Sequence, residues 1–261
     1  MFNRINSICL SLSMLLINGC SSTINKISSP PEDTKWVNVE VKNPLPYTAP
    51  FPLEVRYISY KCKKKRISGF DGSVITEPSY NVISVPLQQQ SDDIWKVKVA
   101  TIGGGTCKWS LSAITLGIEY IDATHIEKDL VPGTAVGAEI AFDNDASRNG
   151  TFNIIVGNRL TYSPQYYPLI KRWKNEKEPG MVDKLYLFGK ENAFWNVHLD
   201  INKNQEAWIL YHPKINESKK VEMIFPNDNK EGATYNFLYP NGEKIPSREI
   251  NPDFNKLEKI K

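Results

Sequence analysis

Cysteines are the side chains of this 261-residue chain whose type and spacing point most directly to chemistry. A cysteine sulfur can be acylated, can ligate a metal, or can pair with a second cysteine in a disulfide. Cys9 and Cys20 lie near the start of the chain, whereas Cys62 and Cys107 lie in its body. We therefore expect two different roles for the cysteines, one at the N-terminus and one in the fold.

The first nineteen residues have the layout of a secretory signal. Arg4 gives the start of the chain one cation, and residues 8–17 form an apolar run relieved only by Ser11 and Ser13. That run is too short to cross a bilayer, for which about 20 residues are needed. A basic start, a short apolar run and small residues are typical of a signal peptide, so residues 1–19 are left out of the fold prediction.

The residues Ile17-Asn18-Gly19-Cys20 resemble the lipobox of bacterial lipoproteins. The resemblance implies cleavage before Cys20 and acylation of its sulfur and its freed amine, with palmitate-like chains that anchor the protein in a membrane. Ser21 follows the cysteine instead of Asp, which in enterobacterial lipoproteins implies the periplasmic face of the outer membrane. The alternatives are an ordinary secreted protein in which Cys20 happens to follow the cleavage site, or a buried cysteine in a helix.

Cys62 and Cys107 are the two cysteines left for the folded body. An even number of cysteines in an oxidising envelope compartment predicts a Cys62–Cys107 disulfide. The alternative is a pair of reduced thiols that bind a metal or do redox chemistry. Neither cysteine belongs to a CxxC motif and no histidine is near in sequence, so we favour the disulfide.

The charge balance is close to neutral. Removal of residues 1–19 leaves 242 residues with 31 basic side chains, all but Arg4 of the 32, against 29 acidic ones. The resulting net charge near +2 gives no reason to expect a nucleic-acid partner. The length allows one large all-β domain or two small ones.

Beyond residue 35 the apolar side chains alternate with polar ones, and this period of two predicts strands. We expect an all-β, β-sandwich-like fold with one intrachain disulfide and two β-rich subdomains. Residues 20–35 are expected to be the acylated cysteine and a flexible tether. Residues 36–162 are expected to form an N-terminal β-sandwich domain with the disulfide, and residues 163–261 a C-terminal β-rich subdomain with a frayed tail. The expected strands are 36–43, 53–60, 80–87, 94–101, 107–121, two strands within 135–157, 184–189, 194–201, 206–212, 220–225 and 234–245.

Two local signals lie close to Cys107. In residues 107–121 the apolar phase changes after Ala113, which predicts a bulge or a break between two strands there. Residues 103–105 are three glycines without a phosphate-loop context, and we expect them to turn the chain into the disulfide strand with positive φ angles.

No catalytic motif is visible, so we expect no enzyme and no cofactor. There is no GxSxG and no S-x-x-K set, and His125, His198 and His212 have neighbours that suggest solvated or hydrogen-bonded roles. Residues 143–150 place oxygen side chains at alternate positions, as a calcium loop does. Arg148 stands where the turn glycine belongs and Ile154 where the bidentate carboxylate belongs, so we expect a β-hairpin loop and no metal.

Two stretches are candidate partner-binding surfaces. One is the run of cations at residues 63–66, which is either a solvated strand edge or a contact for a partner or anionic lipid. The other is "YSPQYYPLIKRW", which mixes aromatic side chains with cations as interface hot spots do, but which also suits a linker packed between two sheets. The candidate residues are Lys63, Lys64, Lys65, Arg66, Tyr166, Tyr167, Lys171, Arg172 and Trp173.

The segments "LEVRYISYKCKKKRISG", "GGGTCKWSLSAITLGIEYIDATH", "DLVPGTAVGAEIAFDN" and "SPQYYPLIKRW" resemble a family of enterobacterial lipoproteins encoded beside type VI secretion genes and antibacterial lipases. The likeness covers most of residues 50–175. It implies an immunity protein that binds and neutralises a cognate antibacterial phospholipase effector by occluding its active-site cleft. The alternative is a structural or accessory envelope lipoprotein of a secretion or surface-assembly system.

Overall fold

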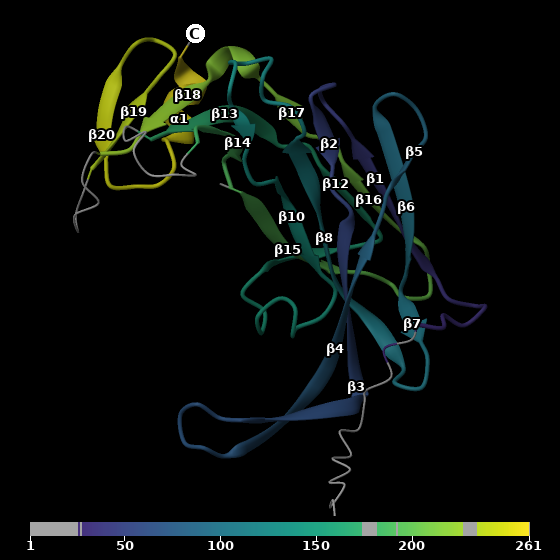
Figure 1. Cartoon of the computed structure of the whole chain (residues 1–261). Helices are drawn as coiled ribbons and strands as arrows, with labels where there is room; N and C mark the ends of the chain where they lie inside the picture. The colour runs from purple at the N-terminus through teal and green to yellow at the C-terminus, as the bar shows by residue number, and fades with distance from the viewer. Residues whose placement is uncertain (1–25, 27, 174–181, 192, 227–233, 261) are drawn as a thin grey trace, which may run out of the picture.

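The computed structural model describes residues 26, 28–173, 182–191, 193–226 and 234–260. Cys20, the signal segment and most of the tether lie outside these residues. The described chain is nearly all β, with twenty strands, one helix and one turn of 3-10 helix (Figure 1). The all-β prediction is therefore confirmed.

A five-stranded sheet forms one layer of a sandwich. Its strand order is β12 (Arg159–Tyr162), β16 (Ala207–Tyr211), β1 (Trp36–Lys42), β6 (Ile94–Ala100) and β5 (Gln88–Gln89). The central strand β1 pairs antiparallel with β6 and parallel with β16. Alternate residues of these strands point inward, as the period of two predicts.

An eight-stranded sheet forms the facing layer. Its main order is β11 (Asn153–Val156), β15 (Phe194–Asp200), β10 (Val136–Ala141), β8 (Trp109–Tyr120), β3 (Leu53–Ile67) and β4 (Val74–Val85). The short strands β2 (Thr48–Pro50) and β7 (Ile102–Gly104) also pair with β8. Between β3 and β8 the register jumps from Ala113 to Leu111, which confirms the bulge expected near Ala113.

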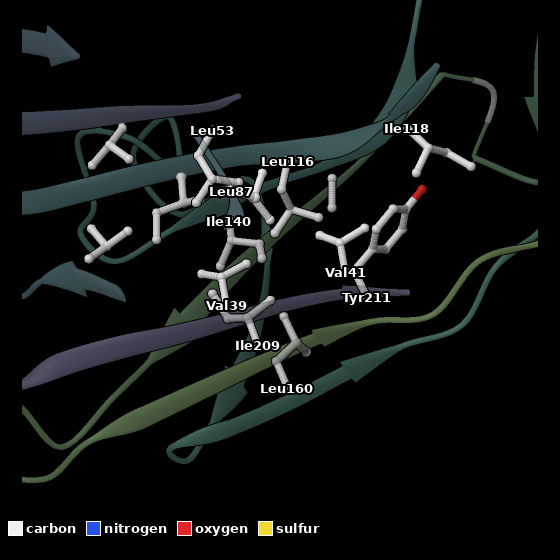
Figure 2. Close-up of a cluster of buried hydrophobic side chains, with 14 of the residues drawn as sticks. Val39, Val41, Leu53, Leu87, Leu116, Ile118, Ile140, Leu160, Ile209 and Tyr211 are labelled. Atoms are coloured by element: carbon white, nitrogen blue, oxygen red, sulfur yellow. The ribbon is translucent and has the colours of Figure 1, made fainter. Parts of the chain in front are cut away.

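The core lies between these two sheets (Figure 2). Val39, Leu160 and Ile209 of the five-stranded sheet point toward Leu116 and Ile140 of the eight-stranded sheet. All five side chains are almost completely buried. Burial of such aliphatic side chains, at about 1.5–3 kcal/mol each, is the main force that holds two sheets face to face.

A third sheet lies at one end of the sandwich. Its main order is β20 (Lys244–Ser247), β19 (Tyr235–Leu238), β18 (Val221–Ile224), β13 (Gln165–Arg172), β14 (Lys184–Gly189) and β9 (Val131–Pro132), and β17 (Lys214–Ile215) pairs with β13. The 3-10 turn η1 (Glu217–Lys219) precedes β18, and the helix α1 (Phe254–Lys259) follows β20. Leu257 of α1 is fully buried in a second, smaller core with Phe237 and Met223. Residues 254–260 are thus packed, and the expectation of a frayed tail is wrong for them.

Strand pairing crosses the boundary expected at residues 162 and 163. Strand β16 pairs with β1 and β12, and β15 lies between β10 and β11, so strands from the second half complete both sheets of the first. The residues between β10 and β11 are therefore not a β-hairpin loop. Parallel pairing between distant strands leaves no periodic trace in the sequence, which explains both differences.

The segment expected to link two halves contains the central strand β13 of the third sheet. Pro168 is tolerated there because it lies between the residues that pair with β17, at 165–166, and those that pair with β18, at 169–172. At that point one neighbouring strand has ended and the next has not begun, so the missing N–H of proline removes little from that side of the ladder.

The Cys62–Cys107 disulfide is present, with the two Cα atoms 5.2 Å apart. Gly104 and Gly105, just before Cys107, have φ angles of 61° and 69°, as expected for the turn into this strand, whereas Gly103 lies in β7 without a positive φ. A Cβ on Gly104 would also lie only 2.1 Å from the carbonyl oxygen of Ser29, because the N-terminal segment passes against this turn.

Candidate functional site

The most prominent exposed feature is the outer half of the β3–β4 hairpin, residues 60–78, which we call the arm. Figure 1 shows the arm projecting from the sandwich on the side away from β19 and β20. Its strands pair from Lys63 with Pro78 to Ile67 with Val74. The turn is closed by the Asp71 carboxylate, which accepts hydrogen bonds from the Ser73 N–H at 3.1 Å and from the Ser73 hydroxyl at 2.8 Å.

The tip of the arm exposes three large apolar side chains. Phe70 is 99% exposed, Ile67 is 73% exposed and Val74 is 65% exposed. Ile67 and Val74 are opposite each other in the ladder, so they lie on the same face of the hairpin. An apolar group of this kind at the end of a projecting hairpin has no packing role in the described fold, which is typical of a contact surface.

The predicted cation run lies on the arm, and its side chains alternate between the two faces of the hairpin. On one face Lys64 and Arg66 both form ion pairs with Glu77, at 3.2 and 2.9 Å. The hydrogen bond from Arg66, followed by that from Lys64, lowers the pKa of Glu77. On the other face Lys63 and Lys65 are exposed and form no ion pair within the described residues. That second face is the one that carries Ile67 and Val74.

The root of the arm is fixed to the sandwich. The β3–β4 register jumps between Ser59 and Lys63, so three extra residues bulge out, and the last of them, Cys62, is bonded to Cys107. Close by, the Asn81 side-chain amide donates a hydrogen bond of 2.9 Å to the carbonyl oxygen of Lys26. The described N-terminal segment therefore packs beside the arm root.

A second candidate surface is the outer face of the five-stranded sheet. Ladder partners place Arg159, Trp208, Asn38 and Lys98 in one row across β12, β16, β1 and β6. Trp208 is 38% exposed and lines an open hollow of about 580 Å³ together with polar side chains of the neighbouring strands. We call this row and hollow the Trp208 surface. An exposed tryptophan beside an arginine, with polar groups around it, is the composition of a protein-binding hot spot.

Sequence reasoning missed Trp208, Arg159 and Phe70. A signal for Trp208 was present, because residues 207, 209 and 211 of "EAWILYH" point inward and the tryptophan must then point outward. A signal for Phe70 was also present, because a large aromatic residue between Gly69 and Gly72 in a turn has no core to join.

Tyr166 and Tyr167 are not available for partner binding. They are 2% and 3% exposed because β13 is a central strand and not a surface linker. The Tyr211 hydroxyl donates to the Tyr166 hydroxyl at 3.0 Å, and the Tyr167 hydroxyl donates to Glu258 of α1. The expectation that these two tyrosines contact a partner is wrong, since each faces a core.

The cations and tryptophan that follow are engaged within the fold. Arg172 forms ion pairs with Glu222 at 2.6 Å, Glu127 at 2.7 Å and Asp183 at 3.0 Å, and these hydrogen bonds raise its pKa. The remaining two side chains pack on aromatic rings: Lys171 lies 4.6 Å from the ring centre of Tyr186, and Trp173 stacks on Phe225 at 3.9 Å. Arg172 therefore joins β13 to its neighbour β18 and to the segments that hold Glu127 and Asp183.

The loop compared with a calcium site, residues 143–150, is bonded to β3 and β4, and we call it the latch. Asp145 accepts hydrogen bonds from Arg56 of β3 and from the Tyr80 hydroxyl of β4. Burial and the nearby Asp145 carboxylate raise the pKa of Tyr80 to about 12. Ser147 of the same loop lies 3.1 Å from His198 of β15. Among the residues that the structure describes, no cluster of His, Cys, Asp or Glu is arranged to hold a metal ion.

The other two histidines lie against carboxylates. His125 is 2.8 Å from Glu217 and stacks on Tyr47 with a ring separation of 3.7 Å. His212 is 2.9 Å from Glu40, which also pairs with Lys96. Both contacts join separate strands or loops and so contribute to the fold.

Comparisons with protein-family models, with curated proteins and with solved structures found no match to this chain. Within the described part of the chain, no helix has the length and apolar character needed to cross a bilayer.

Proposed function

We propose that this protein is a membrane-anchored periplasmic immunity lipoprotein, held on the outer membrane by acyl chains on Cys20. It binds an incoming type VI secretion phospholipase effector and neutralises it by covering its active-site cleft. The lipobox resemblance supports the anchor, and the resemblance to lipoproteins encoded beside lipases supports the partner. We place the binding site for the effector on the Trp208 surface, and this surface is the structural feature that supports the proposal most directly.

The Trp208 surface suits a protein partner for physical reasons. Trp208 and Arg159 adjoin on neighbouring strands, where one supplies apolar area and the other a planar cation. The sheet beneath is rigid because Val39, Leu160 and Ile209 pack on its inner side. A preformed surface loses little conformational entropy on binding, which favours high affinity.

Anchoring adds to neutralisation without any further contact. A tethered inhibitor meets a phospholipase on the membrane that the enzyme must reach, so its effective concentration there is raised. Replacement of Cys20 by serine should therefore release a folded protein into the soluble periplasm and weaken protection while leaving the free energy of unfolding unchanged.

The test is a binding titration between the intact protein and the lipase encoded beside it. We expect a stoichiometric complex, with W208A and R159E each weakening it at least tenfold, the loss expected for a hot-spot residue. R248E and I250S, at exposed positions near β20, are matched controls that should bind normally. A complex that is unchanged by W208A would exclude the Trp208 surface, and no complex at micromolar concentrations would exclude the immunity function.

A competition assay tests the same proposal in cells. A strain that lacks this protein should be killed by its toxin-bearing parent and rescued by the wild-type gene. A deletion strain that survives but assembles its secretion apparatus poorly would instead support the structural envelope role.

A further inference from the structure

We propose that the arm is a membrane-contact element, whose apolar tip enters the interface of an anionic phospholipid bilayer while Lys63 and Lys65 bind the lipid phosphates. This inference concerns a surface different from the Trp208 surface, and two of its arguments, the acyl anchor and the exclusion of a phospholipase cleft, rest on the proposed function.

The order of side chains along one face of the arm is the first argument. Starting from the root, that face presents Lys63 and Lys65, then Ile67 opposite Val74, with Phe70 in the turn beyond. A bilayer has the same order from outside inward, since anionic phosphates lie above the acyl chains. Interfacial elements place cations at the headgroups and aromatic or aliphatic side chains below them.

The charges on the opposite face of the arm support the same orientation of the arm toward the bilayer. There, Glu77 neutralises part of the charge of Lys64 and Arg66 through two ion pairs. The unpaired cations are therefore on the same face as the exposed apolar side chains. A hairpin made only to remain solvated has no need for this segregation, and its Phe70 would have no reason to be 99% exposed.

The place where the N-terminal segment meets the sandwich is the third argument. Lys26 packs beside the arm root through Asn81, and Cys20 precedes Lys26 by six residues, which span at most about 21 Å. The paired strands from Asn81 to Val74 advance by seven residues, or about 24 Å, and the turn that holds Phe70 lies beyond them. With Cys20 acylated, the root would be held close enough to the bilayer for the tip to reach it.

A protein cleft is the other occupant to consider, and charge disfavours the cleft of a phospholipase. A site that accepts anionic phospholipids favours cationic linings, and these would repel Lys63 and Lys65. Acidic lipids instead attract both lysines, and the attraction is weakened by salt.

The test uses the full chain with C9S and C20S, so that it carries no acyl group, and a single introduced cysteine for an environment-sensitive fluorophore. The label is placed at G69C, where a side chain meets open space, and in a control protein at E249C. Vesicles of phosphatidylethanolamine and phosphatidylglycerol, with a quencher attached to the acyl chains, report whether each label enters the membrane. We expect quenching at position 69 and none at position 249, with the effect lost in phosphatidylcholine vesicles and at about 1 M salt.

Variants in the G69C protein separate the two contributions. F70S should abolish most of the quenching, and K63E/K65E should lower the vesicle partition coefficient about tenfold or more. K244E/R248E changes the net charge by the same amount at exposed positions on and after β20 and should have little effect. Because the label reports the tip alone, the apolar run at residues 8–17 cannot imitate the result. A label at position 69 that stays in water on anionic vesicles would overturn the proposal, and shielding of that label only when the lipase is added would assign the arm to the protein partner.

Discussion

Cys62 and Cys107 join the root of the arm to the turn before β8, across 45 residues of sequence. Cys107 is buried at 1% exposure in the core, whereas Cys62 lies in the bulge where β3 leaves the sandwich. The bond therefore has two effects. It restricts the conformations open to the unfolded chain, and it holds the root of the arm against the sandwich.

The first prediction concerns this bond. C62S/C107S should lower the free energy of unfolding by about 4 kcal/mol, the chain-entropy value for a loop of this length. Urea unfolding measures the loss, and limited proteolysis should show faster cleavage within the arm. A double variant that is as stable as the wild type would show that the bond does not constrain the fold.

The second prediction concerns the latch, the loop of residues 143–150 that Asp145 bonds to β3 and β4. R56M removes the ion pair to Asp145 and the contact of the guanidinium with the Tyr80 ring, 4.2 Å away. Because both partners are about one-quarter to one-third exposed, we expect a loss of about 1–2 kcal/mol and faster hydrogen exchange in the loop. R66M, whose ion pair with Glu77 is on the exposed arm, should leave the free energy of unfolding nearly unchanged. Equal effects of the two variants would argue against a latch.

The third prediction is an acid-dependent loss of stability through Glu40. The hydrogen bond from Lys96, aided by His212, lowers the pKa of Glu40 below 4.5 in the folded protein. A carboxyl group with a lowered folded-state pKa stabilises the fold above its unfolded-state pKa, and this stabilisation is lost as the pH falls through the folded-state value. Urea unfolding at a series of pH values should therefore show a steeper decline below about pH 4.5 for the wild type than for E40Q. E249Q, which removes an exposed carboxylate near the end of β20, is the control and should keep the wild-type slope.

The fourth prediction concerns two glycines that face each other. Gly137 of β10 pairs with Gly117 of β8, and a Cβ on Gly137 would lie 1.9 Å from the carbonyl oxygen of Leu116. G137A should force the two strands apart and destabilise the protein by about 3 kcal/mol or more. G69A, in the turn of the arm, meets no atom within 4 Å and should be neutral or slightly stabilising. A wild-type melting temperature for G137A would show that the strands can separate at little cost.

Local elements of this fold follow closely from its sequence. The strand predicted at 184–189 matches β14 residue for residue, and the bulge near Ala113 and the cysteine pairing are confirmed as well. Each of these depends on neighbours in the chain, on side-chain period, or on a count of cysteines.

The sequence does not show which strands pair when they are far apart in the chain. Residues 61–67 read as a polar run after a strand, yet they continue β3 to Ile67 because β4 is beside them. The sequence suggests that Tyr166 and Tyr167 are surface aromatics, yet they are buried because β13 is a central strand, which β14 and β17 flank at this point, and each tyrosine joins a core. The Trp208 surface likewise exists only because β12, β16 and β1 meet, so its row of side chains cannot be seen in any one segment.

The parallel pairing of β1 with β16 also determines when the protein can fold. The Asn38 side chain bonds to the carbonyl oxygen of Ala207, 169 residues later in the chain, and β16 has both β1 and β12 as neighbours. A chain that emerges N-terminus first cannot complete the five-stranded sheet until β16, which ends at Tyr211, has been delivered, and such non-local pairing makes folding slow. If the protein is exported as an unfolded chain, as the proposed lipoprotein would be, this delay favours passage across the inner membrane, because the sandwich closes only after β16 arrives.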